Sequence, residues 1–276
     1  MELRVLIDNN TYIDRYYFGE PALSFLIKDG DTTVLFDTGY SGIFTENAEL
    51  MGEDLSKVDC VVLSHGHNDH TGGLKELLNQ QTKLHIIAHP ETFARRYDDN
   101  GLFIGSPLSA EEIETSAQVT YTKDVLQLSE HLYYLGEIPT LLPFEKRIPI
   151  GKISRDGRLY SDEIRDDSAL IYVNENGIFM ISGCAHSGIC SIIEYAKKVS
   201  GKNKVLGVIG GFHLFEDDAR TKETIAYLKN EQIKDIYPCH CVSLKVKTKM
   251  AEAFEIHEVG VGMSVTVSEE GCETHE

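Results

Sequence analysis

The sequence predicts a single domain over residues 1–276, of the α/β or α+β class, in which helices and sheets pack in layers. Each half of the chain begins with a strand hairpin and continues with strands that alternate with helices. No sequence repeat, low-complexity stretch or linker divides the 276 residues. A chain of this length can bury a core that needs no disulfide or structural metal to hold it.

The first half opens with an apolar hairpin around an Asp-Gly-Asp turn. The elements expected here are strands at 22–28 and 32–36, a helix at 41–52, a strand at 60–63, a helix at 74–78 and a strand at 83–89. The run at 60–63 is short, apolar and bounded by polar residues, which is typical of a buried strand. Residues 118–135 alternate as strands do, and the Pro-, Gly- and charge-rich stretch 138–165 is expected to be a loop.

The second half repeats this order with a hairpin around an Asn-Glu-Asn-Gly turn. Its expected elements are strands at 168–173 and 177–182, a helix at 188–199, a strand at 204–209, a helix at 218–230, a strand at 234–237 and a helix at 243–254.

The charge of the chain excludes one large class of partner. Lys and Arg number 26 against 44 Asp and Glu, a net charge of −18, and such a surface repels nucleic acid. No window reaches the roughly 18 apolar residues of a membrane span. The first apolar stretch contains Glu2, Arg4 and Asp8, unlike a signal peptide, so we expect a cytoplasmic protein with no membrane partner and reduced cysteines.

The segment Ser64-His65-Gly66-His67-Asn68-Asp69-His70 carries the strongest functional signal. It places three imidazoles and a carboxylate within six residues, directly after the strand expected at 60–63. Neutral imidazole and carboxylate are the ligands that zinc, iron and manganese accept. The alternative is a polar loop whose histidines only form hydrogen bonds, and the spacing of four ligand-type residues argues against it.

This segment resembles the metallo-β-lactamase superfamily. The likeness rests on His65-x-His67-x-Asp69-His70 after an apolar strand, with Asp37-Thr38-Gly39 upstream. It implies a four-layer αββα sandwich with a metal site at one edge. Segments 183–189, 210–214 and 238–240 are similar to a subfamily of metal-dependent hydrolases that includes dihydropterin-methyl-ribofuranosylaminobenzene-phosphate synthases.

The resemblance implies two metal positions. The implied ligands are His65, His67 and a later histidine for the first metal, and Asp69, His70 and a late histidine for the second. His186 and His240 both follow apolar strands, so they are the candidates that close the two positions, the alternative being surface histidines in loops. The expected cofactor is one or two divalent metal ions, with zinc first and iron or manganese also compatible.

Two further residues are candidates near this site. Cys184 stands where the superfamily often has a bridging aspartate; it is a thiolate ligand, a supporting residue behind the ligands or a small buried group, and the last two interpretations are preferred. His213 ends a strand next to Gly210 and Gly211, and it is either a proton donor or substrate clamp or a plain loop histidine. The resemblance favours the functional role. Asp69 is expected to orient water as well as to bind metal.

The expected loop at 138–165 is a basic island in an acidic chain. Arg147, Arg155 and Arg158 are candidates for binding a phosphate or carboxylate, because a guanidinium group matches both. The alternative is a solvated charged surface.

These features favour a hydrolase that uses a metal-bound hydroxide on a small anionic substrate. Phosphoester cleavage comes first, ahead of carboxylic ester, thioester or lactam cleavage. The alternative is a transferase that joins a pterin to a ribofuranosylaminobenzene phosphate, as the resemblance implies for some members. A third hypothesis is a metal-bearing ligand-binding or regulatory protein without turnover. The sequence predicts no particular oligomeric state.

Overall fold

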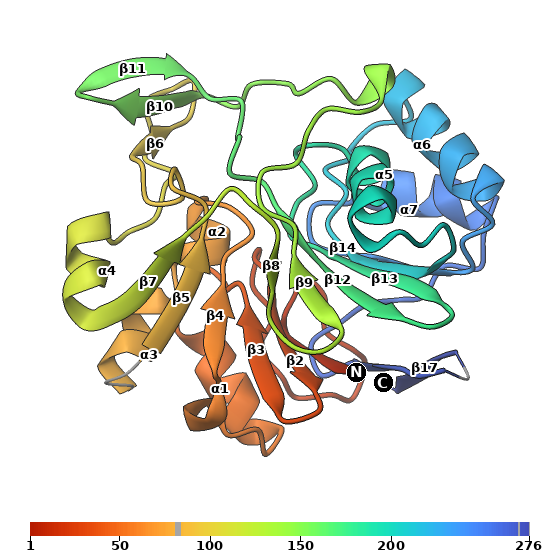
Figure 1. The fold of residues 1–276 in the computed structure, drawn as a ribbon, viewed down its shortest axis with the longest axis horizontal. Helices are drawn as coiled ribbons and strands as arrows, with labels where there is room; N and C mark the ends of the chain where they lie inside the picture. Colours follow the sequence, from red (N-terminus) through yellow and green to blue (C-terminus); the bar gives the residue numbers. More distant parts are fainter. Residues whose placement is uncertain (81–83, 270, 276) are drawn as a thin grey trace.

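The computed structural model describes residues 1–80, 84–269 and 271–275, and two large sheets form its centre. The sheets pack face to face, and helices cover the outer face of each (Figure 1). This arrangement confirms the four-layer αββα sandwich expected from the sequence.

The first sheet has the strand order β17-β16-β1-β2-β3-β4-β5-β7. Its strands are β1 (Glu2–Ile7), β2 (Ser24–Asp29), β3 (Thr32–Phe36), β4 (Cys60–Val62), β5 (Leu84–Ala88), β7 (Ala117–Tyr121), β16 (Ser264–Val267) and β17 (Cys272–His275). Strands β3, β4, β5 and β7 run parallel to one another. The hairpin and the two strands expected next are confirmed, although Lys83, the first residue of the strand expected at 83–89, lies outside the described residues. Strands β1, β16 and β17 are additions that the sequence analysis did not predict.

The second sheet has the strand order β15-β14-β13-β12-β9-β8. Its strands are β8 (Leu126–Gln127), β9 (Leu132–Tyr134), β12 (Ala169–Asn174), β13 (Gly177–Ser182), β14 (Val205–Gly210) and β15 (Asp235–Pro238). The hairpin β12–β13 is antiparallel, and β13, β14 and β15 run parallel. The second half of the chain therefore forms the strands that its alternating pattern predicts.

Apolar side chains fill the space between the sheets and the space under the helices. Phe25 and Phe36 of the first sheet lie in one fully buried cluster with Phe179 and Ile181 of the second. Burying one such side chain stabilises the fold by about 1.5–3 kcal/mol. The helices α1 (Ile43–Leu50), α3 (Leu74–Gln80) and α4 (Ala110–Ser116) cover the first sheet, and α5 (Ile189–Ser200), α6 (Ala219–Asn230) and α7 (Leu244–Ala251) cover the second.

The prediction that residues 138–165 form a loop is wrong for the second half of this stretch. Strands β10 (Lys152–Arg155) and β11 (Arg158–Ser161) form a hairpin that pairs with β6 (Arg96–Tyr97) in a small third sheet. Asp156 and Gly157 take positive φ values of 50° and 74° at its turn, as a two-residue hairpin turn requires. This hairpin stands apart from the main sheets and is largely exposed (Figure 1). Its strands therefore carry charged residues and lack the apolar pattern by which a buried strand is predicted from sequence.

The parallel strands place several loops at one end of the sandwich. In the first sheet Phe36 pairs with Val62, so β3 and β4 end side by side; the segment after β4 continues into the short helix α2 (Asn68–Thr71). In the second sheet Ser182 pairs with Gly210 and Gly210 with Pro238, so β13, β14 and β15 also end level. The segments that follow these five strands carry all the candidate ligands. Among the described residues no helix has both the length and the apolar character that crossing a membrane requires.

Candidate metal centre

Four overlapping groups of three possible metal-binding side chains meet where these loops converge, and two of these groups contain no cysteine. We call these two the imidazole triad (His65, His67 and His186) and the mixed triad (Asp69, His70 and His240). Within each triad the nitrogen or oxygen atoms that could bind a metal all lie within 4.8 Å of one another. The structure thus brings together the six ligands expected from two distant parts of the sequence.

The spacing of the imidazole triad fits one cation. His65 Nε2 lies 2.9 Å from His67 Nδ1 and 3.3 Å from His186 Nε2. Two nitrogen ligands of one tetrahedral zinc lie about 3.3 Å apart, given zinc–nitrogen distances of about 2.0–2.1 Å. All three side chains are buried, which fixes the rings in place.

Hydrogen bonds on the far side of the rings fix which nitrogen faces the centre of the mixed triad. His70 Nδ1 donates to Asp37 Oδ2 at 2.7 Å, and His240 Nδ1 donates to Asn9 Oδ1 at 3.2 Å. When both rings are neutral, their two Nε2 atoms therefore carry lone pairs, and they face each other at 3.2 Å. Two lone pairs at this distance repel unless a proton or a metal cation lies between them, so the donor set can hold a divalent metal in place of that proton.

Asp37, which accepts the hydrogen bond of His70, also supports the imidazole triad through Ser64. Ser64 Oγ donates to Asp37 Oδ2 at 2.7 Å and accepts a hydrogen bond from His65 Nδ1 at 2.9 Å. His65 Nε2 is thereby left as an acceptor that points at the triad. Asp37, which the sequence analysis used only as part of a resemblance, supports one ring in each triad.

The charges around the two triads differ. Burial, together with the neighbouring imidazoles, lowers the pKa of His65 and His186 well below the usual range, and burial and Arg96 lower that of His67 to about 4. Burial also lowers the pKa of His70, but the carboxylates of Asp69 and Asp37 outweigh it and raise the pKa to about 9. The imidazole triad therefore offers neutral ligands, whereas the surroundings of the mixed triad favour positive charge.

Two adjacent carboxylates hold the loops that carry the imidazole triad. Asp166 Oδ2 accepts the backbone N–H of Gly66 at 2.8 Å, and Asp167 Oδ1 accepts that of His186 at 3.1 Å. A side chain at Gly66 has no room, because its Cβ would lie 1.9 Å from the Thr92 carbonyl oxygen. The sequence analysis missed both aspartates, since no spacing rule connects Gly66 with a residue 100 positions later.

A buried arginine compensates the charge of these supports. Arg96 is fully buried, and its Nε donates to Asp162 at 2.8 Å while its second terminal nitrogen donates to Asp166. Buried charges of this kind are retained only when they are paired and hydrogen-bonded. Arg96 thus joins β6 to the loop of His65 and His67, and nothing in the sequence distinguishes it from the adjacent Arg95.

Backbone strain concentrates in the same loops. Asp37, Ala185, His213 and His240 have positive φ values of 59°, 55°, 49° and 49°. Residues with a Cβ adopt this conformation rarely, and it costs of order 1–3 kcal/mol each unless the surroundings enforce it. The strain therefore marks the loops in which the donors are held in place.

A cavity of about 560 Å³ opens above the triads. Its lining includes metal-binding candidates together with polar and apolar side chains: Asn9, Pro21, Tyr40, His67, Asn68, Asp69, Asp98, Ile104, Ile150, Cys184, His186, His213, Phe215, His240 and Cys241. The His213 ring lies 4.4 Å from that of His186 and 4.9 Å from that of Phe215, and burial with the charge of Arg220 lowers its pKa to about 4. His213 therefore presents a neutral imidazole to whatever occupies the cavity.

The three arginines expected to bind substrate lie elsewhere. The Arg147 guanidinium donates to the carbonyl oxygens of Ile164 and Ile138, and Arg155 pairs with Glu91 through two bonds of 2.8 Å. Arg158 is exposed at the turn of the β10–β11 hairpin. None of the three is among the described residues that line the cavity.

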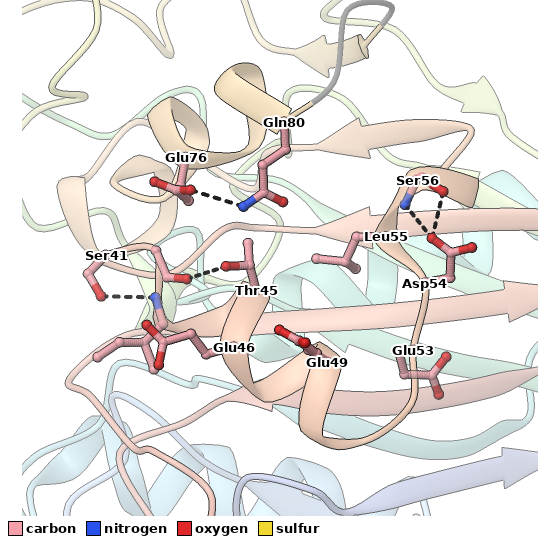
Figure 2. Close-up of a pocket in the computed structure, with 12 residues that line it drawn as sticks. Ser41, Thr45, Glu46, Glu49, Glu53, Asp54, Leu55, Ser56, Glu76 and Gln80 are labelled. Atoms are coloured by element: carbon pink, nitrogen blue, oxygen red, sulfur yellow. Dashed lines mark hydrogen bonds between the residues drawn. The ribbon is translucent and has the colours of Figure 1, made fainter.

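A second hollow offers a different chemistry. Figure 2 shows it between α1, α3 and the segment 53–56, with Gln80 donating to Glu76 and Ser56 to Asp54. Its charged lining residues are Glu46, Glu49, Glu53, Asp54 and Glu76. The described residues group imidazole and thiol donors only around the two triads, so this acidic groove lacks the nitrogen and sulfur donors of a transition-metal site.

Comparisons with known proteins agree with this geometry. The sequence profile of the metallo-beta-lactamase superfamily matches residues 17–197. The 7,8-dihydropterin-6-methyl-4-(beta-D-ribofuranosyl)-aminobenzene-5'-phosphate synthase of Methanocaldococcus jannaschii is 33% identical over 254 residues, which cover 87% of this chain and 86% of that protein.

Two solved structures show the same fold. Tm1679, a metal-dependent hydrolase of the beta-lactamase superfamily, matches with a TM-score of 0.85 and 24% identity, over 98% of this chain and 100% of that one. Zinc-bound PqqB of Methylobacterium extorquens matches with a TM-score of 0.54 and 12% identity, over 96% of this chain and 100% of that one.

Proposed function

This chain belongs to the metallo-beta-lactamase superfamily, and we propose that it is a metal-dependent hydrolase of a small phosphorylated molecule. The superfamily binds divalent metals, and the described donor groups suit them. In the proposed enzyme each triad holds one divalent ion, zinc before iron or manganese.

One observation carries this proposal: within each triad the imidazole nitrogens face one another beneath an open cavity, at 2.9 and 3.3 Å in the imidazole triad and at 3.2 Å in the mixed triad. When bound, a divalent metal supplies Lewis acidity, which polarises the group under attack and lowers the pKa of water to about 7. The buried supports of Asp37, Asp166 and Asp167 keep the ligands in position before any metal arrives.

The chain's own side chains take the remaining roles. The Asp69 side chain is 28% exposed and lies at the cavity, so its carboxylate can accept a hydrogen bond from the attacking water and orient it. His213 also lines the cavity and can hold the leaving group. Tyr40 and Phe215 give the walls flat apolar surfaces.

The second candidate is a synthase, in which an aromatic amine rather than water accepts the transferred group, a pterin. The 33% identity over most of both chains favours it, because the matching protein is named for a product with pterin, aminobenzene and phosphate groups. The aromatic and aliphatic walls suit flat rings as well as they suit a hydrolase substrate. In either reaction the substrate is a small anion, and binding of its phosphate by Arg158 at the exposed hairpin remains part of the proposal.

A substrate panel separates these functions. Zinc-loaded protein is assayed with phosphomonoesters, phosphodiesters and a pterin diphosphate, the last with and without ribofuranosylaminobenzene phosphate. Release of phosphate without the amine supports the hydrolase, and a joined product formed only with the amine supports the synthase. His67→Ala should abolish either activity, whereas the matched control His85→Ala, whose ring bonds Thr120 on the first sheet, should not. No turnover in the whole panel would instead favour a metal-bearing binding protein.

A further inference from the structure

Two cysteines from different loops meet at the wall of the cavity. Cys184 follows β13 and Cys241 follows β15, and both side chains line the cavity above the triads. Their sulfur atoms lie within 4.8 Å of each other, and both thiols are free. Cys241 Sγ also lies 3.6 Å from the carbonyl oxygen of Cys184. A small molecule in the cavity can therefore reach a pair of neighbouring thiols.

Gly211 keeps the space between these two cysteines clear. A Cβ at residue 211 would lie 2.5 Å from Cys241 Sγ and 3.3 Å from Cys184 Cα. A disulfide bond is about 2.05 Å long, so the two sulfurs must approach each other by less than about 3 Å. A change of one rotamer moves a cysteine sulfur by a comparable distance. Side-chain rotation with a small shift of the loops is thus enough to join them.

We propose that Cys184 and Cys241 are a redox-active pair, which hydrogen peroxide converts into a disulfide bond. Cys241 is the more exposed of the two, so its sulfur attacks one peroxide oxygen; the O–O bond breaks, water leaves and a sulfenic acid remains. The Cys184 sulfur then displaces the hydroxyl group as a second water. Two thiols thereby lose two hydrogen atoms, and the peroxide is reduced to water. This modification is separate from the proposed hydrolase or synthase activity, and only its effect on zinc rests on the proposed metal centre.

The disulfide would pull on the loop that carries His240. Cys241 directly follows His240 in the chain, and its Sγ accepts the backbone N–H of His213 at 3.2 Å. Movement of this sulfur toward Cys184 breaks that hydrogen bond and shifts His240. Because His240 Nε2 must stay near that of His70 for both to bind one cation, the mixed triad should lose zinc affinity.

The loop that carries His186 is held more firmly. Cys184 is two residues before His186, but Asp167 accepts the backbone N–H groups of His186 and Ser187 at 3.1 and 2.9 Å. The imidazole triad should therefore keep its zinc. Oxidation of the pair thus acts as a switch for one of the two metal positions.

Peptide mapping of the zinc-free full chain tests the proposal. Cleavage after lysine and arginine places Cys184 in the peptide 166–197 and Cys241 in the peptide 235–245. The protein is treated with hydrogen peroxide, and the remaining thiols are alkylated before cleavage. We expect the two peptides to be joined, and dithiothreitol to separate them.

Each of these peptides contains a second cysteine that serves as a matched control. Cys190 lies in the first peptide and Cys239 in the second; both are buried in the apolar core and neither lines the cavity. The link should persist in Cys190→Ala and in Cys239→Ala, and it should disappear in Cys184→Ala and in Cys241→Ala. Elemental analysis should find one equivalent of zinc less in the oxidised protein than in the reduced protein, and dithiothreitol should restore it.

The outcomes separate this proposal from the function proposed above. Peptides that stay separate in the unaltered protein, or a sulfinic acid at one cysteine in place of the link, overturn the proposal. A link through Cys190 or Cys239 also overturns it, and fragment ions of the joined peptides reveal such a link even where a variant does not fold. A link between Cys184 and Cys241 with unchanged zinc content supports the disulfide and overturns the switch. Failure of the reduced protein to take up zinc overturns the metal centre, while the peptide map still decides the disulfide.

Discussion

The two triads lie side by side, yet the chain supports them in different ways. The imidazole triad is buried and contains no carboxylate. Two of its loops are held through backbone N–H groups that Asp166 and Asp167 accept, and one ring, that of His65, is held through Ser64. The mixed triad reaches the cavity through Asp69, and its rings are held directly, by Asp37 behind His70 and by Asn9 behind His240. The imidazole triad thus depends on two loops and one indirectly held ring, whereas the mixed triad depends on two directly held rings and on charge.

This difference predicts which substitutions should weaken metal binding at one triad and not at the other. A neutral, buried triad gains its affinity from the placement of its loops, because its ligands carry no charge that attracts a cation. A triad with two nearby carboxylates gains affinity from attraction as well, and the raised pKa of His70 reports the same field. Variants of the supporting residues can therefore separate the two positions.

The largest effect is expected from removing a ligand of the imidazole triad. His65→Ala should lower turnover by more than the about 10–100-fold that loss of a supporting partner costs, and should reduce bound zinc by one equivalent. Elemental analysis beside the activity assay measures both. If both equivalents disappear, the two positions are not independent and the comparison fails.

A smaller but still large effect is expected at the mixed triad from Asp37→Asn. The amide turns one of the two accepting oxygens of Asp37 into a donor and removes the negative charge that attracts a cation, so zinc affinity there should fall about 10–100-fold. Competitive zinc titration measures it. The control Asp59→Asn, on an exposed carboxylate that accepts Thr33 N–H, should bind zinc as the unaltered protein does. Equal weakening of both positions would show that Asp37 acts mainly through Ser64 and His65.

A moderate effect is expected from weakening the loop that carries His186. Unlike Asp37→Asn, this change should lower the zinc affinity of the imidazole triad rather than that of the mixed triad. The two oxygens of Asp167 accept the N–H groups of His186 and Ser187, one each; in Asp167→Asn an NH2 group replaces one of them, so the His186 loop loosens. Zinc affinity of the imidazole triad should fall about 10-fold while the mixed triad is unchanged. A loss confined to the mixed triad would reverse the assignment of supports made above.

The smallest effect is expected outside both triads, at Arg155→Ala. The pair with Glu91 is partly exposed, so its loss should cost about 0.2–1 kcal/mol of unfolding free energy and leave zinc binding unchanged. Thermal unfolding and zinc titration measure these. A several-fold rise in KM for the substrate in this variant would instead place the basic hairpin in substrate binding.

The parts of the fold that the sequence predicts are those with local patterns. The two hairpins, the strand before His65 and the alternating second half all show apolar runs between turn residues. The hairpin of β10 and β11 does not, because its exposed strands carry arginine and lysine where buried strands carry apolar residues. Strand β1 begins with alternating charged and apolar residues, Glu2 to Val5, which is a strand pattern that the sequence analysis did not use; its pairing with β2 and β16 confirms the strand.

The candidate site also has a part that the sequence predicts from local patterns and a part that it does not. The grouping of the candidate ligands was predictable because His65, His67, Asp69 and His70 are close in sequence and because His186 and His240 follow strands. Their supports were not, because a hydrogen bond from Gly66 to Asp166 joins residues 100 positions apart and follows no periodicity. The arginines were predicted to bind substrate because they are clustered in an acidic chain. In the structure Arg147 donates to carbonyl oxygens and Arg155 pairs with Glu91, and neither lines the cavity.

Anomalous diffraction from crystals of the zinc-loaded protein tests the central claim most directly. The account predicts two peaks, one among the donors of His65, His67 and His186 and the other among those of Asp69, His70 and His240. Zinc found only in the groove beside Glu46 and Glu49, or no peak within bonding distance of either triad, would contradict it.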